Sequence, residues 1–170
     1  MSKSFPPLVP YERRASIGQS FSYLGNLATI LASSADTNGQ FGLIELLVKP
    51  GNEPPMHVHE REDELFYVVQ GEVDYILDGH AISAITGSSV FLPRGIPHTF
   101  RVRSAQAWLL VFVTPAGFEG YFKEVAEPTT TLEMPVSLGF SEKQIERCIE
   151  TAAKYGVRFL TPEQQAEIAA

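Results

Sequence analysis

Short runs of apolar, β-branched or aromatic residues, broken by turn residues every 8–12 positions, occupy the chain from about residue 20 to residue 114. This regular spacing is typical of an antiparallel β-sandwich or β-barrel. Asn, Asp and Gly mark the turns at residues 36–39, 70–71 and 78–80. The predicted strands lie within residues 21–32, 41–49, 65–70, 72–77, 81–85, 90–92, 99–103 and 107–113. The sequence therefore predicts an all-β fold.

The pattern changes after Pro115 from strand-like to helix-like. Apolar residues recur at spacings of three and four over 116–126, which predicts a short amphipathic helix. Ser141 with Gln144 three positions on forms a capping box, and the helix it begins should end at Gly156. Thr161 begins a last helical turn. We expect one domain with an extended N-terminal arm (1–19), a β-barrel (20–114) and a helical C-terminal extension packed on the barrel (115–170).

Composition narrows the class of protein and of partner. The chain has 170 residues, 44% of them hydrophobic, which fits one folded domain and neither a disordered nor a membrane protein. No apolar run suits a transmembrane helix or a signal peptide, so we expect a cytoplasmic protein. The net charge of −7 argues against nucleic acid as a partner. The short basic groups Arg13-Arg14 and Arg101 with Arg103 are expected to be solvated terminal and strand positions. The single cysteine, Cys148, is interpreted as a packing residue.

Three of the four histidines stand where they can share one metal ion with a carboxylate. His57 and His59 are two apart, so on one strand their imidazoles point to the same face. Glu64 follows after a tight turn, and His98 reaches the others only if the barrel closes. Histidine and carboxylate donors suit a transition metal, and we predict His57, His59, Glu64 and His98 as its ligands. The fourth histidine, His80, lies in a turn and is expected to be exposed.

The predicted donor set favours a divalent ion that accepts six ligands. Fe²⁺, Mn²⁺, Ni²⁺ or Co²⁺ would keep two positions open for substrate, water or O₂. Four protein ligands would complete the tetrahedral coordination of Zn²⁺ and leave little room for substrate, although the purified protein can also carry this ion. Glu64 is either a fixed ligand or, if a dry pocket raises its pKa, also a catalytic base. Its acidic neighbours Glu60, Glu62 and Asp63 are interpreted as solvated loop charges.

A cluster of aromatic residues predicts a large apolar pocket around the metal, suited to a flat aromatic or other hydrophobic ligand. Six side chains on the strands are candidates for its wall: Met56, Phe66, Phe91, Phe100, Trp108 and Phe112. Three more from the first helix are candidates for a cap over its mouth: Phe118, Tyr121 and Phe122.

The two segments that carry the predicted ligands resemble the two motifs of the cupin superfamily. Gly51, His57, His59, Glu64 and Gly71 match every position of the first motif. The second motif is matched by the residues Gly87, Pro93, Gly95 and His98, while Val102 stands where Asn is usual. This resemblance implies a jelly-roll β-barrel of six to eight strands with the metal inside, and often a homodimer.

Residues 41–75 and 139–160 are further similar to single-domain cupins of the quercetin 2,3-dioxygenase type. That resemblance implies a metal-dependent dioxygenase acting on a flavonol or a related aromatic hydroxy compound. The flavonol 3-hydroxyl would bind the metal, Glu64 would act as ligand and base, and O₂ would cleave the heterocycle with release of carbon monoxide. The alternatives are another metal-dependent cupin enzyme, such as an isomerase or decarboxylase, and a non-catalytic protein that binds a metal or small molecule.

Overall fold

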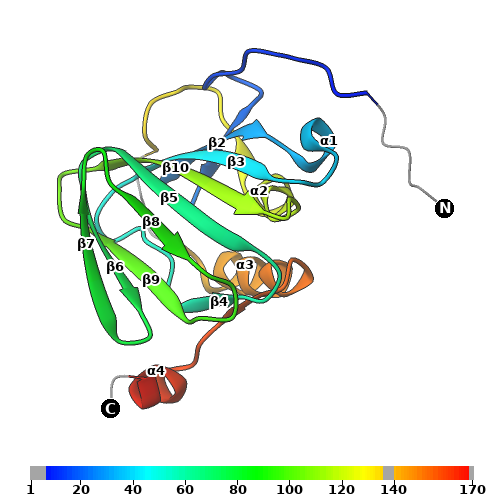
Figure 1. Ribbon diagram of the computed structural model, residues 1–170. Coiled ribbons are helices and arrows are strands. Elements are labelled where there is room, and N and C mark those ends of the chain that lie inside the picture. The colour runs from blue at the N-terminus through cyan, green and yellow to red at the C-terminus, as the bar shows by residue number, and fades with distance from the viewer. Residues whose placement is uncertain (1–6, 136–139, 169–170) are drawn as a thin grey trace.

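The computed structural model describes residues 7–135 and 140–168, in which two antiparallel sheets face each other (Figure 1). The larger sheet has the strand order β11-β1-β2-β3-β10-β5-β8, and the smaller one has the order β12-β4-β9-β6-β7. The larger sheet consists of β1 (Ser20–Tyr23), β2 (Asn26–Ala32), β3 (Gly42–Val48), β5 (Asp63–Gln70), β8 (Ser89–Leu92), β10 (Ala107–Thr114) and β11 (Glu127–Pro128). The smaller sheet consists of β4 (His57–His59), β6 (Glu72–Leu77), β7 (His80–Ile85), β9 (His98–Val102) and β12 (Val157–Phe159). The predicted all-β jelly-roll fold is confirmed.

Alternation of side chains along the strands builds the core between the two sheets. In β6, Val73 and Tyr75 are buried, whereas Glu72 is exposed and Asp74 half-buried, as the period of two requires. In β10, every second residue from Ala107 to Val113 is buried in the same way. These inward-facing side chains form one hydrophobic cluster, which also includes Ala152 of the C-terminal part.

Most predicted strand boundaries agree with the structure within one or two residues. The exception is the run 21–32, which the structure divides into the hairpin β1–β2. Leu24 and Gly25 form its turn with positive φ angles of 45° and 73°. This turn was not predicted, because Leu rarely adopts positive φ.

In the described part of the chain, four short helices accompany the barrel: α1 (Ser34–Thr37), α2 (Glu119–Val125), α3 (Glu142–Lys154) and α4 (Pro162–Ile168). The predicted capping box of Ser141 and Gln144 is present at the start of α3. Gly156, with a φ of 75°, follows the end of α3 as predicted. The C-terminal part is not purely helical, however, because β11 and β12 add one edge strand to each sheet.

Part of the predicted N-terminal arm is fastened to the barrel, and residues 1–6 of that arm lie outside the described part of the chain. The Tyr11 hydroxyl and the Arg13 guanidinium both donate hydrogen bonds to the Leu31 carbonyl, at 3.0 and 3.2 Å. Arg13 also donates two hydrogen bonds to the Asp36 carboxylate, at 2.8 and 3.2 Å. The expectation that Arg13 is a solvated terminal charge is therefore wrong, because a carboxylate of α1 pairs with it.

Substitution of Asp36 by Asn should destabilise the protein in a pH-dependent way. Hydrogen bonds from Arg13, together with those from Ser33, hold the pKa of Asp36 well below its ordinary value despite partial burial. The ionised carboxylate thus contributes stability above about pH 4, and this contribution is lost as the pH falls through the native pKa. We expect Asp36→Asn to lower the free energy of unfolding by about 1–2 kcal/mol at pH 7. Urea denaturation should show this difference shrinking below about pH 4; a constant difference would contradict the assignment.

Gly71 closes the first predicted motif because no side chain fits there. A Cβ atom on Gly71 would lie 2.7 Å from Ser104 Oγ and 2.8 Å from the Gln106 carbonyl oxygen, at a φ of 107°. Gly87 opens the second motif with a φ of 89° but has no atom within 4 Å of such a Cβ.

This pair of glycines predicts two different costs of substitution by alanine. Gly87→Ala should cost only the backbone strain of positive φ, roughly 1–2 kcal/mol. Gly71→Ala should cost about 1–3 kcal/mol more, because backbone atoms must move to admit the methyl group. Urea denaturation of the two variants measures the difference, and equal losses of stability would show that the contact at Gly71 relaxes freely.

The helices of the described part also bear on the predicted class of protein. None of them is long and apolar enough to cross a membrane.

Candidate metal centre

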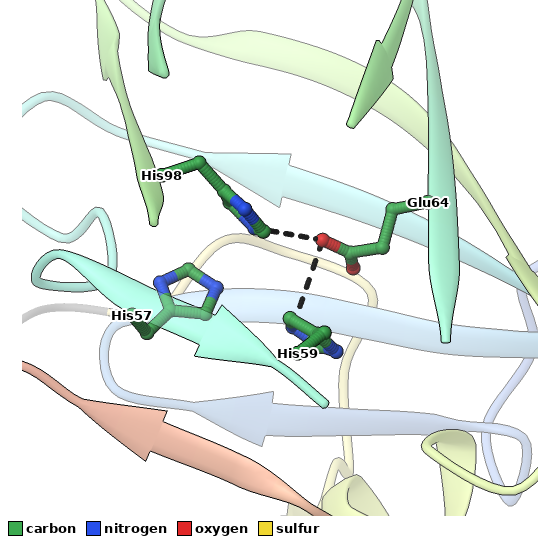
Figure 2. Close-up of side chains that lie close together, drawn as sticks. All are labelled: His57, His59, Glu64 and His98. Atoms are coloured by element: carbon green, nitrogen blue, oxygen red, sulfur yellow. Dashed lines mark hydrogen bonds and ion pairs between the residues drawn. The ribbon is translucent and has the colours of Figure 1, made fainter. Parts of the chain in front are cut away.

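The four predicted ligands come together between the two sheets, inside the barrel (Figure 2). His57 and His59 lie on β4 and His98 begins β9, the neighbouring strand in the smaller sheet, where His57 and His98 are direct partners. Glu64 approaches from β5 in the opposite sheet. The closure of the barrel therefore joins residues that are far apart in the sequence, as the spacing of His98 required.

One potential ligand atom from each residue lies within 4.8 Å of those of the other three, and all four side chains are buried. The Glu64 Oε2 atom is 3.0 Å from His98 Nε2 and 3.6 Å from His59 Nε2. The ring centroid of His57 lies 4.5 Å from that of His98 and 5.2 Å from that of His59. Three imidazoles and one carboxylate that converge in this way fit a single divalent transition-metal ion.

Backbone carbonyls fix which ring nitrogen of His57 and His98 faces the centre. His57 Nδ1–H donates to the Pro55 carbonyl at 2.8 Å, and His98 Nδ1–H donates to the Ile96 carbonyl at 2.9 Å. Each carbonyl belongs to the residue two positions earlier, so the backbone itself holds the ring. With Nδ1 held in this way, Nε2 is the ring nitrogen that would face a bound metal ion.

Burial and mutual charge set the protonation of the cluster. Burial, with the neighbouring His98 and His59, lowers the pKa of His57 to about 3 and keeps its imidazole neutral. Burial alone would raise the pKa of Glu64, but His59 and His98 outweigh it and hold that pKa at about 2. The raised pKa on which the catalytic-base alternative for Glu64 depended is therefore not found, because three imidazoles surround the carboxylate.

Glu62 departs from its predicted role. It was interpreted as a solvated loop charge together with Glu60 and Asp63, but it is only 4% exposed. Its Oε2 atom lies 3.6 Å from His59 Nδ1, on the side of the ring away from Glu64. No periodicity marks this position, because Glu62 lies in the turn between β4 and β5, so the sequence pattern did not separate it from the exposed Glu60.

Hydrogen bonds from the backbone and from the Arg94 side chain connect the second motif to the first. Gly95 N–H donates to the His59 carbonyl at 2.8 Å. Arg94 donates to the Asp63 carboxylate from its backbone N–H at 2.9 Å and from its guanidinium at 3.0 and 2.7 Å. Asp63 is therefore a bracing residue rather than a free loop charge. Val102, which stands where the family pattern has Asn, is a buried core side chain whose N–H donates to Glu53.

A cavity of about 410 Å³ opens beside the four residues, and all four contribute to its wall. Most of the remaining wall is apolar and includes aromatic rings from several elements. The Phe118 ring, just before α2, meets the His59 ring edge-on at 4.6 Å, and the Phe159 ring of β12 lies 5.8 Å from that of His57. The helix α3 closes another side with Ile145, Cys148, Ile149 and Ala152. The site is thus a pocket with a polar, metal-binding wall and otherwise hydrophobic surroundings.

Some of the predicted wall residues lie elsewhere. Phe66, Phe100 and the three predicted capping residues, Phe118, Tyr121 and Phe122, line the cavity. Met56, Phe91, Trp108 and Phe112 do not. Phe91 is 57% and Trp108 37% exposed, because the alternation of their strands turns them to the outer face of the larger sheet.

Two predictions about single residues remain, those for Cys148 and His80. Cys148 is buried in packing on α3, and burial raises the pKa of its thiol, which keeps it protonated. His80 is exposed as predicted, but it begins the strand β7 directly after the turn at Asp78 and Gly79.

Comparison with known proteins agrees with this architecture. Residues 44–114 match the family model of the cupin domain. The chain is 27% identical over 158 residues to quercetin 2,3-dioxygenase of Bacillus subtilis (strain 168), and the match covers 93% of this chain but 47% of that relative. An RmlC-like cupin from Shewanella frigidimarina NCIMB 400 has a TM-score of 0.53 and 22% identity, covering 65% of this chain and 96% of that structure. Pac13 from Streptomyces, a nucleoside dehydratase, has a TM-score of 0.52 and 17% identity, with 65% and 88% covered.

The barrel therefore resembles a cupin domain over residues 44–114, and it carries a buried group of residues suited to a divalent metal. Over most of its length, the chain is similar to a quercetin 2,3-dioxygenase. It spans about half the length of that Bacillus relative, and its likeness to the solved structures concerns the fold.

Proposed function

We propose that this protein is a metal-dependent dioxygenase that acts on a flavonol or a related aromatic hydroxy compound. The observation that carries the proposal is the position of the four predicted ligands in the wall of a large apolar cavity. A ligand in this cavity lies against the metal-binding residues on one side and against aromatic rings on the other. The sequence similarity to the Bacillus quercetin 2,3-dioxygenase supports the reaction type.

The lining of the cavity favours a flat, uncharged substrate. Among the described residues that line it there is no lysine or arginine, so a phosphate group would find no cationic partner. Rings such as Phe66, Phe100 and Phe118 offer faces and edges on which an aromatic ligand can pack. A volume of about 410 Å³ lies within the usual range for sites that hold small organic molecules.

The residues of the centre divide the work of binding and proton transfer. His57, His59, His98 and Glu64 would hold the ion, which when bound supplies Lewis acidity and open positions for the substrate hydroxyl and O₂. Glu64 lines the cavity as a carboxylate, and we assign it as acceptor of the substrate hydroxyl proton. Its pKa of about 2 requires that the bound ion and substrate raise its basicity for this role. Phe118 and Phe159 pack against the histidine rings and exclude water from that side.

Oxygen uptake with quercetin tests the proposed reaction. Protein stripped of metal would be reloaded separately with Fe²⁺, Mn²⁺, Ni²⁺ and Co²⁺, and both O₂ consumption and carbon monoxide release would be followed. We expect one or more ions to give uptake with carbon monoxide in equal amounts, and metal-free protein to give none.

Other results would redirect the assignment to the alternatives considered from the sequence. Binding of an ion without O₂ uptake would contradict the dioxygenase. Conversion of a substrate under anaerobic conditions would then indicate another metal-dependent enzyme, such as an isomerase or a decarboxylase. Retention of metal and ligand without any turnover would indicate a binding protein.

A further inference from the structure

We propose that Glu62 is a positioning residue of the metal centre and acts through His59. This inference rests on the metal site of the proposed function. When His59 Nε2 faces the ion, the proton of the neutral ring resides on Nδ1 and needs an acceptor. The Glu62 carboxylate is placed to accept that hydrogen bond.

Burial of both groups makes the pair informative. The side chains of His59 and Glu62 are 1% and 5% exposed, and their facing atoms Nδ1 and Oε2 are 3.6 Å apart. Neither atom has a hydrogen-bond partner in the described part of the chain. A buried carboxylate oxygen and a buried ring nitrogen are costly without partners, and closing the gap by a few tenths of an ångström would satisfy both.

His59 differs from the other two histidines in what holds its outer nitrogen. The carbonyls of Pro55 and Ile96 accept from His57 and His98, whereas a charged side chain stands behind His59. Glu62 thereby places a second carboxylate next to the centre. Together with Glu64, it would balance the charge of a divalent ion held by the three imidazoles, which would favour binding of the ion.

The loop that carries Glu62 is fastened to the end of α3. Glu60 N–H donates to the Gly156 carbonyl at 2.8 Å, and Arg61 donates from its guanidinium to the Lys154 carbonyl at 2.9 Å. The close approach depends on a glycine, because a Cβ on Gly156 would lie 2.7 Å from Arg61 Nε. These contacts hold the turn between β4 and β5, so the Glu62 carboxylate stays behind His59.

Variants of Glu62 should weaken metal binding without unfolding the barrel. Glu62→Gln keeps the size and an acceptor oxygen but removes the charge, whereas Glu62→Ala removes the acceptor as well. Loss of such an outer partner typically weakens metal affinity by about 10- to 100-fold. We expect that loss for Glu62→Ala and a smaller loss for Glu62→Gln. Glu60→Gln is the matched control, because this carboxylate lies in the same loop with 59% of its side chain exposed.

The test is a Co²⁺ titration of metal-free protein against a competing chelator, with the visible absorption spectrum of bound Co²⁺ and the melting temperature of the metal-free form as further readouts. We expect weaker binding and an altered spectrum for Glu62→Gln, with a melting temperature close to that of the wild type and no change for Glu60→Gln. Equal Co²⁺ affinity and equal spectra for Glu62→Gln and Glu60→Gln would overturn the role of Glu62. Failure of the folded wild type to bind Co²⁺ would instead overturn the metal site itself.

Discussion

Replacement of His98 by alanine is expected to remove the metal ion from the barrel and to reduce quercetin-dependent O₂ uptake to background. His98 is one of four donors, and its Nε2 also lies 3.0 Å from Glu64 Oε2. Its loss leaves three donors, with the buried carboxylate deprived of its nearest partner. Four-ligand protein sites bind Zn²⁺ with roughly 10–16 kcal/mol, so one ligand accounts for a few kcal/mol, or on the order of a 100- to 1000-fold loss in affinity.

The metal content of purified protein and a chelator competition measure this loss directly. His80→Ala is the matched control, because His80 is the remaining histidine of the chain and is exposed at the start of β7. If His98→Ala retains metal as tightly as His80→Ala, the ion is bound elsewhere or not by this cluster. Circular dichroism of both variants confirms that the comparison concerns folded protein.

Glu64→Gln is expected to separate the role of Glu64 as ligand from its role as base. The amide keeps the size of the side chain and one oxygen for the ion, but it does not accept a proton from a substrate hydroxyl. At metal concentrations that restore full occupancy, we expect the turnover number to remain about 10²- to 10⁴-fold below that of the wild type. The loss should fall on the turnover number more than on the Michaelis constant, because the walls of the cavity are unchanged.

Occupancy must be measured in the same samples, since a weakened site lowers activity for a trivial reason. Turnover of fully occupied Glu64→Gln at nearly the wild-type rate would show that Glu64 is only a ligand. Its low pKa in the structure makes this comparison necessary, because a carboxylate held at a pKa of about 2 is a weak base until its surroundings change.

The barrel was predictable because its strands are long enough to show a period. Strand β6 alternates over six residues, so its inward face could be predicted from the sequence. Strand β10 is apolar on both faces, and its outward-facing Trp108 and Phe112 were wrongly predicted for the pocket wall. The ladder that places His57 beside Phe159 was not predictable, since β4 and β12 have three residues each and show no measurable period. Only closure of the sheet reveals that a C-terminal strand borders the metal ligands.

Residue types predicted the ligands better than their surroundings. The four donors stand out because histidine is scarce in this chain and because their spacing matches known motifs. The pocket wall was predicted with mixed success, since an aromatic residue on a strand faces inward or outward according to register alone. Phe100 faces the cavity while Phe91 faces outward, although both lie on strands of the same barrel. Glu62 was missed for a related reason, because burial of a charge in a turn leaves no pattern in the sequence.

The edge strand β12 links the C-terminal part of the chain to the strand that carries two of the predicted metal ligands. Val157 and Phe159 pair with His59 and His57, so the strand that bears two ligands is flanked on one side by residues from the far end of the sequence. Local opening of the segment from α3 to β12 would free β4 on that side, and an ion that binds only the closed form must oppose such opening. Hydrogen exchange of the amides from Val157 to Phe159 should therefore slow when metal is added. Slower hydrogen exchange in this segment, about 60 residues beyond the last ligand, would thus indicate that the centre holds a metal ion.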